Sequence, residues 1–493
     1  MITINNTKHW LIEQADKHPN NPAIQTAQGF ISYQKFSEEC SLVANYLLTN
    51  AVKENDHVGI LFTHNYNFFL IVNSLWFIGA IPVPLNTRKT INEIENEIHL
   101  ADIKFLIIDD SLESQFSTLN FPNVFNMNTI MKHEIRNHDF IIQNSKFIIH
   151  ISSLIMFTSG STGNPKAVVH TFKSLHESVL ALDSFSQLSS SDIWLVSLPL
   201  YHIGGFMILM RALISGSSVV FPSSPKFEDI NQAVKQSNPT HISLVPTILQ
   251  DFLNHNVKLD KNLKFVFLGG SPSQTELISK AVEKSWPIVK VYGSTETCSM
   301  ITALHPSDIK SKPDSVGKLL DKNKIKIMGL PAVTLAGKSK NDSGEIVVSS
   351  KSLFKEYYND QLTTSNKLKD GWYFTGDYGR IDDEGYIYIE SRRDDLIISG
   401  GENITPYEVE SAIRKHPYVN DVFVFALQDK KWGQIVCAVI ESENLTESEI
   451  KKFLNKNIAA YKIPKRFFIV DEIPRNEMGK VNQTELFKQL KLS

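Results

Sequence analysis

The segment best suited to chemistry is a loop of glycine and hydroxyl residues that ends in a lysine, Thr158-Ser-Gly-Ser-Thr-Gly-Asn-Pro-Lys166. It follows Leu154-Ile-Met-Phe157, an apolar run typical of a buried strand. Glycine lets backbone N–H groups turn toward a phosphate, and the hydroxyls and the lysine add donors. The loop is not a Walker A loop, because Ala167 follows the lysine. It therefore predicts either a phosphate site or a flexible polar linker.

Other motifs with useful side chains follow along the chain. Tyr292-Gly-Ser-Thr-Glu296 joins an aromatic ring, hydroxyls and a carboxylate at the end of a predicted strand. Tyr373-Phe-Thr-Gly-Asp377 offers an acid that could bind sugar hydroxyls. A charged junction, Ser391-Arg-Arg-Asp-Asp-Leu-Ile397, is followed by Ser399-Gly-Gly-Glu-Asn403. Near the end of the chain, Pro474-Arg-Asn-Glu-Met-Gly-Lys480 places a lysine in a glycine-containing loop.

Composition limits the classes of function. Of 493 residues, 42% are hydrophobic and 21% are charged, which is ordinary for a globular protein. The formal net charge of −3 leaves no basic surplus for nucleic acid or an anionic membrane. Cys40, Cys298 and Cys437 are too scattered for a metal site or a disulfide framework, which fits a reducing compartment.

No targeting segment and no membrane insertion are expected. The first residues lack a basic region followed by an apolar core. The most apolar stretch, Leu195 to Ile214, contains Pro199 and Arg211, whereas a membrane span takes about 20 mostly apolar residues. We therefore expect this stretch in the protein interior and the chain in the cytoplasm.

Helical and strand patterns alternate along residues 1–150 and again after the loop, which predicts an α/β fold of βα units with parallel sheets. Residues 120–145 are expected to be irregular. Predicted helices are Trp10–Lys17, Tyr33–Leu48 and Phe68–Ile78. Predicted strands are Val58–Phe62, Lys104–Ile108, Val219–Phe221, His241–Val245, Lys264–Leu268 and Ile288–Tyr292.

The pattern changes toward the C-terminus. Gly344–Ser349 and Tyr386–Glu390 alternate as in an antiparallel β subdomain. We expect a domain boundary at Asp394, with a large domain over residues 1–393 and a small mobile α+β domain over residues 394–493. Capping boxes predict that helices start at Thr405–Glu408 and Thr446–Glu449, and strands are predicted at Val422–Ala426, Ile435–Ile440 and Phe467–Val470.

Taken in this order, the five motifs resemble the adenylate-forming superfamily of acyl-CoA synthetases, luciferases and peptide-synthetase adenylation domains. The resemblance runs from Trp10 to the end of the chain. Five motifs in the family's order argue against a chance resemblance. They also argue against the interpretation of the first motif as a flexible linker. Ser391 departs from the family pattern, which usually has glycine there.

Within the superfamily, the chain is most similar to the 2-succinylbenzoate–CoA ligases of bacterial menaquinone synthesis. The similar segments lie in or beside the shared motifs, so they specify the chemistry more firmly than the substrate. The similar segments are Ser153–Gly160, His241–Pro246, Thr295–Ser299, Lys312–Gly317 and Arg392–Asn403.

The resemblance implies two reaction steps that use ATP, Mg²⁺ and coenzyme A. A small-molecule carboxylate attacks the α-phosphate of ATP, and the thiol of coenzyme A then displaces AMP from the acyl-adenylate. The first step joins two anions, so catalysis should depend on positioning and on charge neutralisation.

The resemblance also assigns roles to residues around the nucleotide. Thr295 would bind the α-phosphate and Glu296 the magnesium ion, which prefers few carboxylates plus phosphates. The β- and γ-phosphates would be bound by Thr158, Ser159, Gly160, Ser161, Thr162, Gly163 and Lys166. The adenosine would be bound by Gly269, Gly270, Ser271, Tyr292, Gly293, Ser294, Asp377 and Arg392.

Taken alone, several of these residues have simpler explanations. Lys166 and Glu296 are of types that are usually solvated at a surface, and Tyr292 could simply pack in the core. Asp377 could be a turn residue, and Arg392 could form a surface ion pair.

The small domain would act in both steps. Lys480 would bridge the substrate carboxylate and the α-phosphate in the first step only, although by composition it is an ordinary exposed lysine. Asp394 would be the hinge about which the domain reorients. Gly400 and Gly401 would then approach the site and let the pantetheine arm of coenzyme A pass.

The acyl pocket is the least defined part. His202, in Tyr201-His-Ile-Gly-Gly205, is expected to gate or line this pocket, although a lone histidine in an apolar run is more often a core residue. A dicarboxylate such as 2-succinylbenzoate keeps one carboxylate that requires a donor or a cation. The sequence does not identify that group.

Three alternatives compete with this ligase. One is another aryl- or fatty-acyl-CoA synthetase, and another is a stand-alone adenylation module that loads a carrier protein. A nucleotide-binding protein without turnover would be expected to lack some of Lys480, Glu296 and Asp377, yet all three are present. A homo-oligomer is left open.

Overall fold

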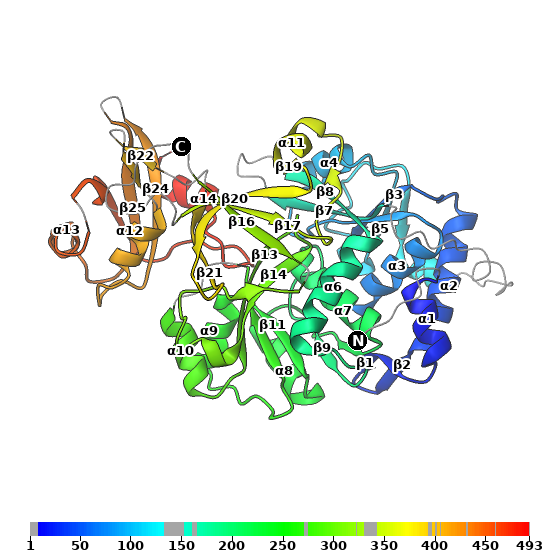
Figure 1. Ribbon diagram of the computed structural model, residues 1–493. Coiled ribbons are helices and arrows are strands. Elements are labelled where there is room, and N and C mark those ends of the chain that lie inside the picture. The colour runs from blue at the N-terminus through cyan, green and yellow to red at the C-terminus, as the bar shows by residue number, and fades with distance from the viewer. Residues whose placement is uncertain are drawn as a thin grey trace. The chain divides into compact units, whose positions relative to one another are not determined.

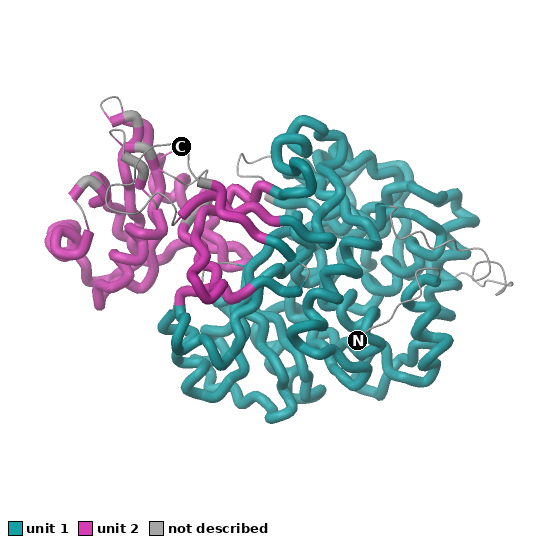
Figure 2. Tube along the Cα trace, viewed as in Figure 1, with its two compact units in different colours: residues 1–313, 319–324, 349–373 teal, residues 314–318, 325–348, 374–493 magenta. Residues whose placement is uncertain are grey.

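The computed structural model describes residues 8–132, 152–159, 165–270, 275–321, 323–329, 343–392, 397–399, 402–404, 406–429, 432–458 and 460–492. The chain forms two compact units (Figure 2). Unit 1 comprises residues 1–313, 319–324 and 349–373, and unit 2 comprises residues 314–318, 325–348 and 374–493. The expected boundary at Asp394 stays a prediction, because residues 393–396 lie outside the described residues.

The largest sheet of unit 1 has a parallel centre with antiparallel edges. Strands β13, β12, β11, β9, β10 and β1 pair in parallel, whereas β14 and β2 pair antiparallel at the two sides. The strands are β1 (Pro22–Thr26), β2 (Gly29–Ser32), β9 (Ile193–Leu195), β10 (Ser218–Val220), β11 (His241–Leu244), β12 (Phe265–Leu268), β13 (Ile288–Ser294) and β14 (Ser299–Leu304).

Helix α7 (Ile203–Ser215) is the buried element of this region. Its neighbours are β9, β10, β14 and the helices α1 and α6, and Figure 1 shows α6 beside it. A helix that is apolar on all sides belongs in an interior, so the expectation for residues 195–214 is confirmed. The other helices of this part are α1 (Trp10–Lys17), α6 (Phe172–Ser186), α8 (Phe227–Ser237), α9 (Pro246–Asn254) and α10 (Thr275–Glu283).

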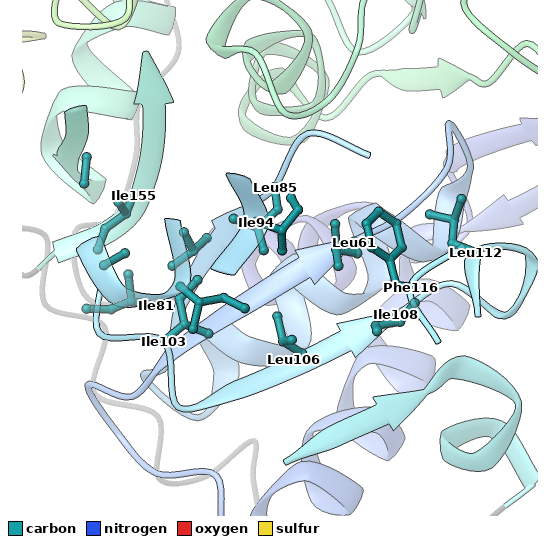
Figure 3. Packing of buried hydrophobic residues seen from close by; sticks show 14 of the residues in the cluster. Leu61, Ile81, Leu85, Ile94, Ile103, Leu106, Ile108, Leu112, Phe116 and Ile155 are labelled. Carbon is teal, nitrogen blue, oxygen red and sulfur yellow. The ribbon is translucent and has the colours of Figure 1, made fainter. Parts of the chain in front are cut away.

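A second, parallel sheet of unit 1 has the strand order β4-β3-β5-β6. Its apolar side chains pack in one cluster, in which Figure 3 shows Leu61 and Ile108 from the sheet, Ile94 from α4 and Ile155 from β7. The elements are β3 (His57–Leu61), β4 (Ile81–Pro84), β5 (Phe105–Ile108), β6 (Val124–Asn126), α2 (Tyr33–Thr49), α3 (Tyr66–Phe77), α4 (Ile91–Leu100) and α5 (Met127–Lys132).

A third, small sheet of unit 1 has the order β18-β8-β7 and is antiparallel. Strands β7 and β8 pair with each other, and the glycine-rich segment lies between them in the sequence. The elements are β7 (Ser152–Ser159), β8 (Pro165–Thr171) and β18 (Glu356–Tyr357), with α11 (Gln361–Lys367) and β19 (Leu368–Lys369) close in sequence.

Unit 2 contains two further sheets. In the first, β17 lies between β16 and β20, and β21 pairs antiparallel with β20. The expected antiparallel β subdomain is therefore present. Its strands are β16 (Lys324–Gly329), β17 (Gly344–Ser349), β20 (Trp372–Ile381) and β21 (Ile387–Arg392), and the short strand β15 (Lys318–Leu319) lies at a division between the units.

The second sheet of unit 2 has the order β23-β22-β25-β24, with β26 parallel to β25. Apolar clusters cover it, one of them with the helices α12 and α13 and the other with α14. The elements are β22 (Ile397–Ser399), β23 (Glu402–Ile404), α12 (Pro406–Ile413), β24 (Asp421–Asp429), β25 (Gly433–Glu441), α13 (Glu447–Leu454), β26 (Arg466–Val470) and α14 (Gln483–Gln489).

The expected elements are present, with ends shifted by a few residues, and the capping box at Thr446 and Glu449 opens α13 as expected. Thr405 of the other box lies outside the described residues. One expectation was wrong. Residues 120–145 were expected to be irregular, but β6 and α5 occupy residues 124–132, because Val124–Asn126 can add to the edge of β5. Residues 133–145 lie outside the described residues.

The three cysteines, Cys40, Cys298 and Cys437, are free thiols and all are buried. Burial raises the pKa of Cys298 to about 12 and that of Cys437 to about 11. None of the helices in the described part of the chain has the length and apolar character that crossing a bilayer requires.

Candidate active site

The β7–β8 hairpin positions the two ends of the glycine-rich loop. Thr158 pairs with Lys166, and Ser159 pairs with Pro165, at the open end of the hairpin. Gly160, Ser161, Thr162 and Gly163 lie outside the described residues. The structure therefore shows the positions of Thr158 and Lys166, which lie at the two ends of the expected phosphate loop.

The second motif forms the turn between β13 and β14. Gly293 has no room for a side chain, because a Cβ atom there would lie 1.8 Å from the carbonyl oxygen of Ser299. The hydroxyl of Thr297 accepts a hydrogen bond from the backbone N–H of Ser294 at 2.7 Å. This close packing holds Thr295 and Glu296 at the carboxyl end of a parallel-sheet strand, where α/β folds bind ligands.

Tyr357 connects these two motifs. Its hydroxyl donates a hydrogen bond of 2.9 Å to Oε1 of Glu296, and the Nζ atom of Lys166 lies 5.4 Å from the centroid of its ring. Burial and the charge of Glu296 both raise the pKa of Tyr357, so the phenol stays protonated as a donor. A cation and a carboxylate that are distant in sequence are thus both next to Tyr357, Lys166 over its ring and Glu296 at its hydroxyl.

Glu296 fits the role of a magnesium ligand by its donor type. Its side chain is buried, and no group of three or more histidine, cysteine or acidic side chains able to hold a metal occurs in the described ranges. A site with a single carboxylate suits Mg²⁺, which takes most of its other ligands from phosphates and water.

His170 is a site neighbour that the sequence did not reveal. Its Nε2 atom lies 2.9 Å from the carbonyl oxygen of Thr295, and its Nδ1 atom lies 3.2 Å from Oγ of Ser174. Burial lowers the pKa of His170 to about 4, so the ring is neutral at pH 7. Because a carbonyl can only accept, Nε2 carries the hydrogen and holds the backbone of Thr295.

The expected adenine-binding segment lies at the same sheet edge. Gly269 follows β12, which pairs in parallel with β13, so Gly269 and Gly270 lie beside Tyr292. A Cβ atom on Gly269 would lie 2.7 Å from Cγ2 of Val291, and Gly270 has a φ of +88°. Both positions therefore favour glycine. Ser271 lies outside the described residues.

His202 begins helix α7 as its N-terminal flanking residue, and its side chain does not cap the helix. Its ring is half-buried and lies 4.8 Å from the ring of Tyr201. The role of His202 in the acyl pocket stays a prediction.

The same helix carries a cation that sequence reasoning noted only as a reason against a membrane span. Arg211 is 1% exposed, its Nη2 atom donates to Oγ of Ser299 at 3.2 Å, and its guanidinium lies 5.6 Å from the ring centroid of Trp194. No carboxylate of the described residues pairs with it, and burial lowers its pKa to about 10. It stays charged at pH 7, and the described residues provide no anionic partner for it.

Arg211 lies among other unsatisfied polar groups. The His241 ring stacks on Trp194 at 4.2 Å, and within the described part of the chain His241 Nε2 and Trp194 Nε1 have no hydrogen-bond partner. Ser299 lies opposite Ser294 in the β13–β14 pairing, and the buried Oγ of Ser294 also lacks a partner there. The guanidinium thus reaches the strand pair that carries the expected α-phosphate residues.

In unit 2, Asp377 and Arg392 are Cα partners on the antiparallel strands β20 and β21. Asp377 is 5% exposed, and its backbone N–H donates to Oγ1 of Thr375 at 2.9 Å. The pairing brings together the two residues expected to hold the ribose. The expected hinge and coenzyme A residues, Asp394, Gly400 and Gly401, lie outside the described residues.

Lys480 lies at the end of a tight hairpin turn in unit 2. Its N–H donates to Oδ1 of Asn476 at 3.0 Å, and its carbonyl oxygen accepts the N–H of Asn476 at 2.7 Å. Gly479 has a φ of +73°, a left-handed conformation that suits glycine. The lysine is exposed, as the expected role requires.

An expected phosphate loop, an acidic turn at a sheet edge and a second unit with a loop lysine together indicate an enzyme that activates a substrate with a nucleotide. The family model of AMP-binding enzymes matches residues 11–358, and that of the AMP-binding enzyme C-terminal domain matches residues 408–480. The chain belongs to the AMP-binding enzyme family.

Two of its curated relatives carry the same name. A 2-succinylbenzoate–CoA ligase of Bacillus cereus (strain Q1) is 31% identical over 486 residues, covering 97% of this chain and 98% of the relative. The enzyme of the same name from Bacillus subtilis (strain 168) is 30% identical over 479 residues, covering 97% of both chains. The expectation of an AMP-forming acyl-CoA ligase is thereby confirmed.

Solved structures agree with the fold. The o-succinylbenzoate CoA synthetase from Bacillus subtilis, in complex with its acyl-adenylate intermediate, has a TM-score of 0.88 at 30% identity, covering 97% of this chain and 98% of that chain. The same enzyme in complex with ATP and magnesium ion has a TM-score of 0.87 at 30% identity, with the same coverage. The predicted α/β fold with a small C-terminal domain is confirmed.

Proposed function

We propose that the chain is an ATP-dependent 2-succinylbenzoate–CoA ligase of menaquinone biosynthesis. It would form 2-succinylbenzoyl-adenylate and pyrophosphate, and then 2-succinylbenzoyl-CoA and AMP. The relatives named above support the two-step reaction with ATP, Mg²⁺ and coenzyme A. The observation that supports 2-succinylbenzoate as the substrate is the buried cation Arg211. The described part of the chain provides no anionic partner for it.

The charge balance explains why Arg211 points to a second carboxylate. An unpaired charge in an interior costs several kcal/mol, so buried charges are almost always paired. The carboxylate that reacts is consumed as an acyl group, but 2-succinylbenzoate keeps another one. We propose that this second carboxylate pairs with Arg211, helped by Ser299, which already accepts from Nη2.

The first step would use the residues around Tyr357. Lys166 and the hydroxyls of the glycine-rich loop would bind the β- and γ-phosphates, and Thr295 would bind the α-phosphate. Glu296, oriented by Tyr357, would hold a magnesium ion, which would neutralise phosphate charge when bound. Lys480 would then place its ammonium between the attacking carboxylate and the α-phosphate.

The remaining roles follow the family pattern. Gly269, Gly270, Ser271 and Tyr292 would hold the adenine, and Asp377 with Arg392 would hold the ribose. In the second step the small domain would turn about Asp394, and Gly400 and Gly401 would replace Lys480 near the site. We place the enzyme in the cytoplasm, where ATP and coenzyme A are available and where three free cysteines are compatible with the redox state.

The proposal is tested by thioester formation with ATP, Mg²⁺ and coenzyme A across a panel of acids. The panel contains 2-succinylbenzoate, benzoate, 4-chlorobenzoate, a coumarate, and short and long fatty acids. The matched control is 4-oxo-4-phenylbutanoate, which keeps the succinyl chain and lacks the ring carboxylate. We expect kcat/KM for 2-succinylbenzoate to exceed the others by at least about a hundredfold, equivalent to about 2.7 kcal/mol.

Other outcomes would favour the alternatives. A higher kcat/KM for a different acid would make the chain another aryl- or fatty-acyl-CoA synthetase. Adenylate without any thioester would favour a module that loads a carrier protein. Equal kcat/KM values for 2-succinylbenzoate and 4-oxo-4-phenylbutanoate would contradict the proposed pairing of Arg211 with the second carboxylate.

A further inference from the structure

We propose that Arg475, anchored on Asp421, is a positioning residue that holds the loop of Lys480 in the shape needed for adenylate formation. This inference rests on the role proposed above for Lys480. It concerns residues of unit 2 only, so it depends on no contact with unit 1.

The loop is a hairpin with its own internal hydrogen bonds. Asn482 N–H donates to the carbonyl oxygen of Pro474 at 2.8 Å, and Gly479 N–H donates to that of Asn476 at 2.8 Å. The side-chain oxygen of Asn476 accepts two more backbone hydrogen bonds, from Met478 and Lys480, each at 3.0 Å. These bonds define the turn but leave its direction relative to the sheet unspecified.

Arg475 supplies that direction. Its Nη1 atom donates to the carbonyl oxygen of Gly479 at 2.6 Å, and this carbonyl belongs to the peptide bond that leads into Lys480. Its Nε atom donates to Oδ2 of Asp421 at 2.8 Å, and its Nη2 atom donates to the same oxygen. One guanidinium thus joins the backbone just before the lysine to the first residue of β24.

Asp421 is itself well anchored. Its Oδ1 atom accepts the backbone N–H of Val422 at 2.8 Å and lies 3.5 Å from Nη2 of Arg414. Arg414 extends from the end of α12 and also donates to the carbonyl oxygen of Val422 at 3.1 Å. Glu410, one turn earlier, lies 3.5 Å from Arg414 and accepts the N–H of Val424 at 2.9 Å. The anchor is therefore continuous with the packed sheet.

This arrangement differs from an ordinary surface ion pair, whose contribution is usually below about 1 kcal/mol. The side chains of Arg475 and Asp421 are 28% and 16% exposed, so solvent screens the pair only in part. The guanidinium bonds two separate segments through three N–H groups in a fixed plane. A lysine has one ammonium and cannot reproduce this geometry.

The expected consequence is kinetic. A donor that stabilises a transition state must be held within a fraction of an ångström, and a displacement of about 1 Å can cost about a hundredfold in rate. We therefore expect Arg475→Ala, and also Arg475→Lys, to lower the rate of adenylate formation by about tenfold to a hundredfold. Conversion of supplied 2-succinylbenzoyl-adenylate and coenzyme A to thioester should change less than about twofold.

The test measures both half-reactions in Arg475→Ala, Arg475→Lys, Asp421→Asn, Lys480→Ala and the double variant Arg475→Ala/Lys480→Ala. Lys452→Gln, an exposed lysine on α13, is the control for the loss of one positive charge. If Arg475 acts through Lys480, the double variant should be no slower in adenylate formation than Lys480→Ala alone. Backbone hydrogen exchange at residues 476–481 should rise in Arg475→Ala, independently of any substrate.

The outcomes separate this inference from the proposed function. Parallel loss of both half-reactions, or additive losses in the double variant, would show a general structural role and overturn the positioning role. Unchanged hydrogen exchange in Arg475→Ala would overturn it as well. If Lys480→Ala itself kept full adenylate formation, the proposed role of the lysine would fail instead.

Discussion

Each unit contains one cation to which we assign a role in the proposed reaction, and the two cations are held in opposite ways. Arg211 of unit 1 is buried in α7, and among the described residues its side chain donates a hydrogen bond to Ser299. Lys480 of unit 2 is exposed, and a network of hydrogen bonds fixes the backbone on either side of it. The first cation is held by packing and the second by a hydrogen-bonded turn.

This difference matches the tasks that we propose for them. A group that recognises a substrate can stay in one place throughout the reaction. Burial makes its charge more selective, because an acid without the second carboxylate would leave the buried charge unpaired. A group that serves only one of two steps must be able to leave. It therefore suits a surface loop that keeps its shape while the unit that carries it moves.

The largest effect is expected at the exposed cation. Lys480→Ala should lower adenylate formation by about 10²–10³, since this is the usual cost of removing one preorganised donor. Thioester formation from supplied acyl-adenylate should stay near the wild-type rate. Pyrophosphate release and thioester formation, measured separately by rapid quench, would check this. Equal loss of the two half-reactions would contradict a role confined to the first step.

A smaller effect with a different signature is expected at the buried cation. Arg211→Met should lower kcat/KM for 2-succinylbenzoate by about a hundredfold and leave that for 4-oxo-4-phenylbutanoate nearly unchanged. The free energy of unfolding of the unliganded enzyme should stay the same or rise, because an apolar side chain replaces a buried, unpaired charge. Urea unfolding and steady-state kinetics would measure both quantities.

The exposed Arg88→Met variant, also in unit 1, is the matched control for Arg211→Met. A large loss of stability in Arg211→Met, with both acids affected alike, would mean that the arginine is needed for packing rather than for recognition.

The smallest effect is expected from a change of pH. The pH dependence of substrate selectivity shows whether Arg211 or its neighbour His241 supplies the charge that recognises the second carboxylate. Burial lowers the pKa of Arg211 to about 10, so its charge is lost only as the pH rises toward that value. Burial, supported by the charges of Lys264 and Arg211, lowers the pKa of His241 to about 4, so that ring is already neutral at pH 6. Between pH 6 and 9, the ratio of kcat/KM for 2-succinylbenzoate to that for 4-oxo-4-phenylbutanoate should therefore change by less than about twofold. A ratio that falls steadily from pH 6 to 8 would indicate an imidazolium instead.

Much of the fold could be predicted because it depends on local patterns. Apolar runs of four to six residues became strands such as β11 and β12, and helical spacing predicted α1 with both of its ends. The failure at residues 124–132 arose where the local pattern was too short to show a strand. The edge strand β6 has only three residues, too few to show a period, and it forms because β5 offers hydrogen bonds beside it.

The site could be predicted only as far as its motifs extend. Glu296 was expected as a ligand, but the Tyr357 hydroxyl that orients it lies 61 residues further along the chain. Arg211 was visible as an oddity in an apolar run, yet its contact with Ser299 spans 88 residues. Arg475 lies in a recognised motif, but its anchor Asp421 is 54 residues earlier. Such partners follow from tertiary pairing, which no local pattern encodes.

The burial of all three cysteines has a practical consequence for following the two units in solution. The thiolate is the nucleophile that attacks a thiol reagent, so buried thiols with raised pKa values should label slowly. Cysteines introduced at exposed positions would then be modified selectively in an otherwise native chain. Leu362 in unit 1 is 74% exposed and Tyr418 in unit 2 is 60% exposed, and both could carry dyes. Energy transfer between the two dyes would test whether the small domain reorients between the two proposed steps.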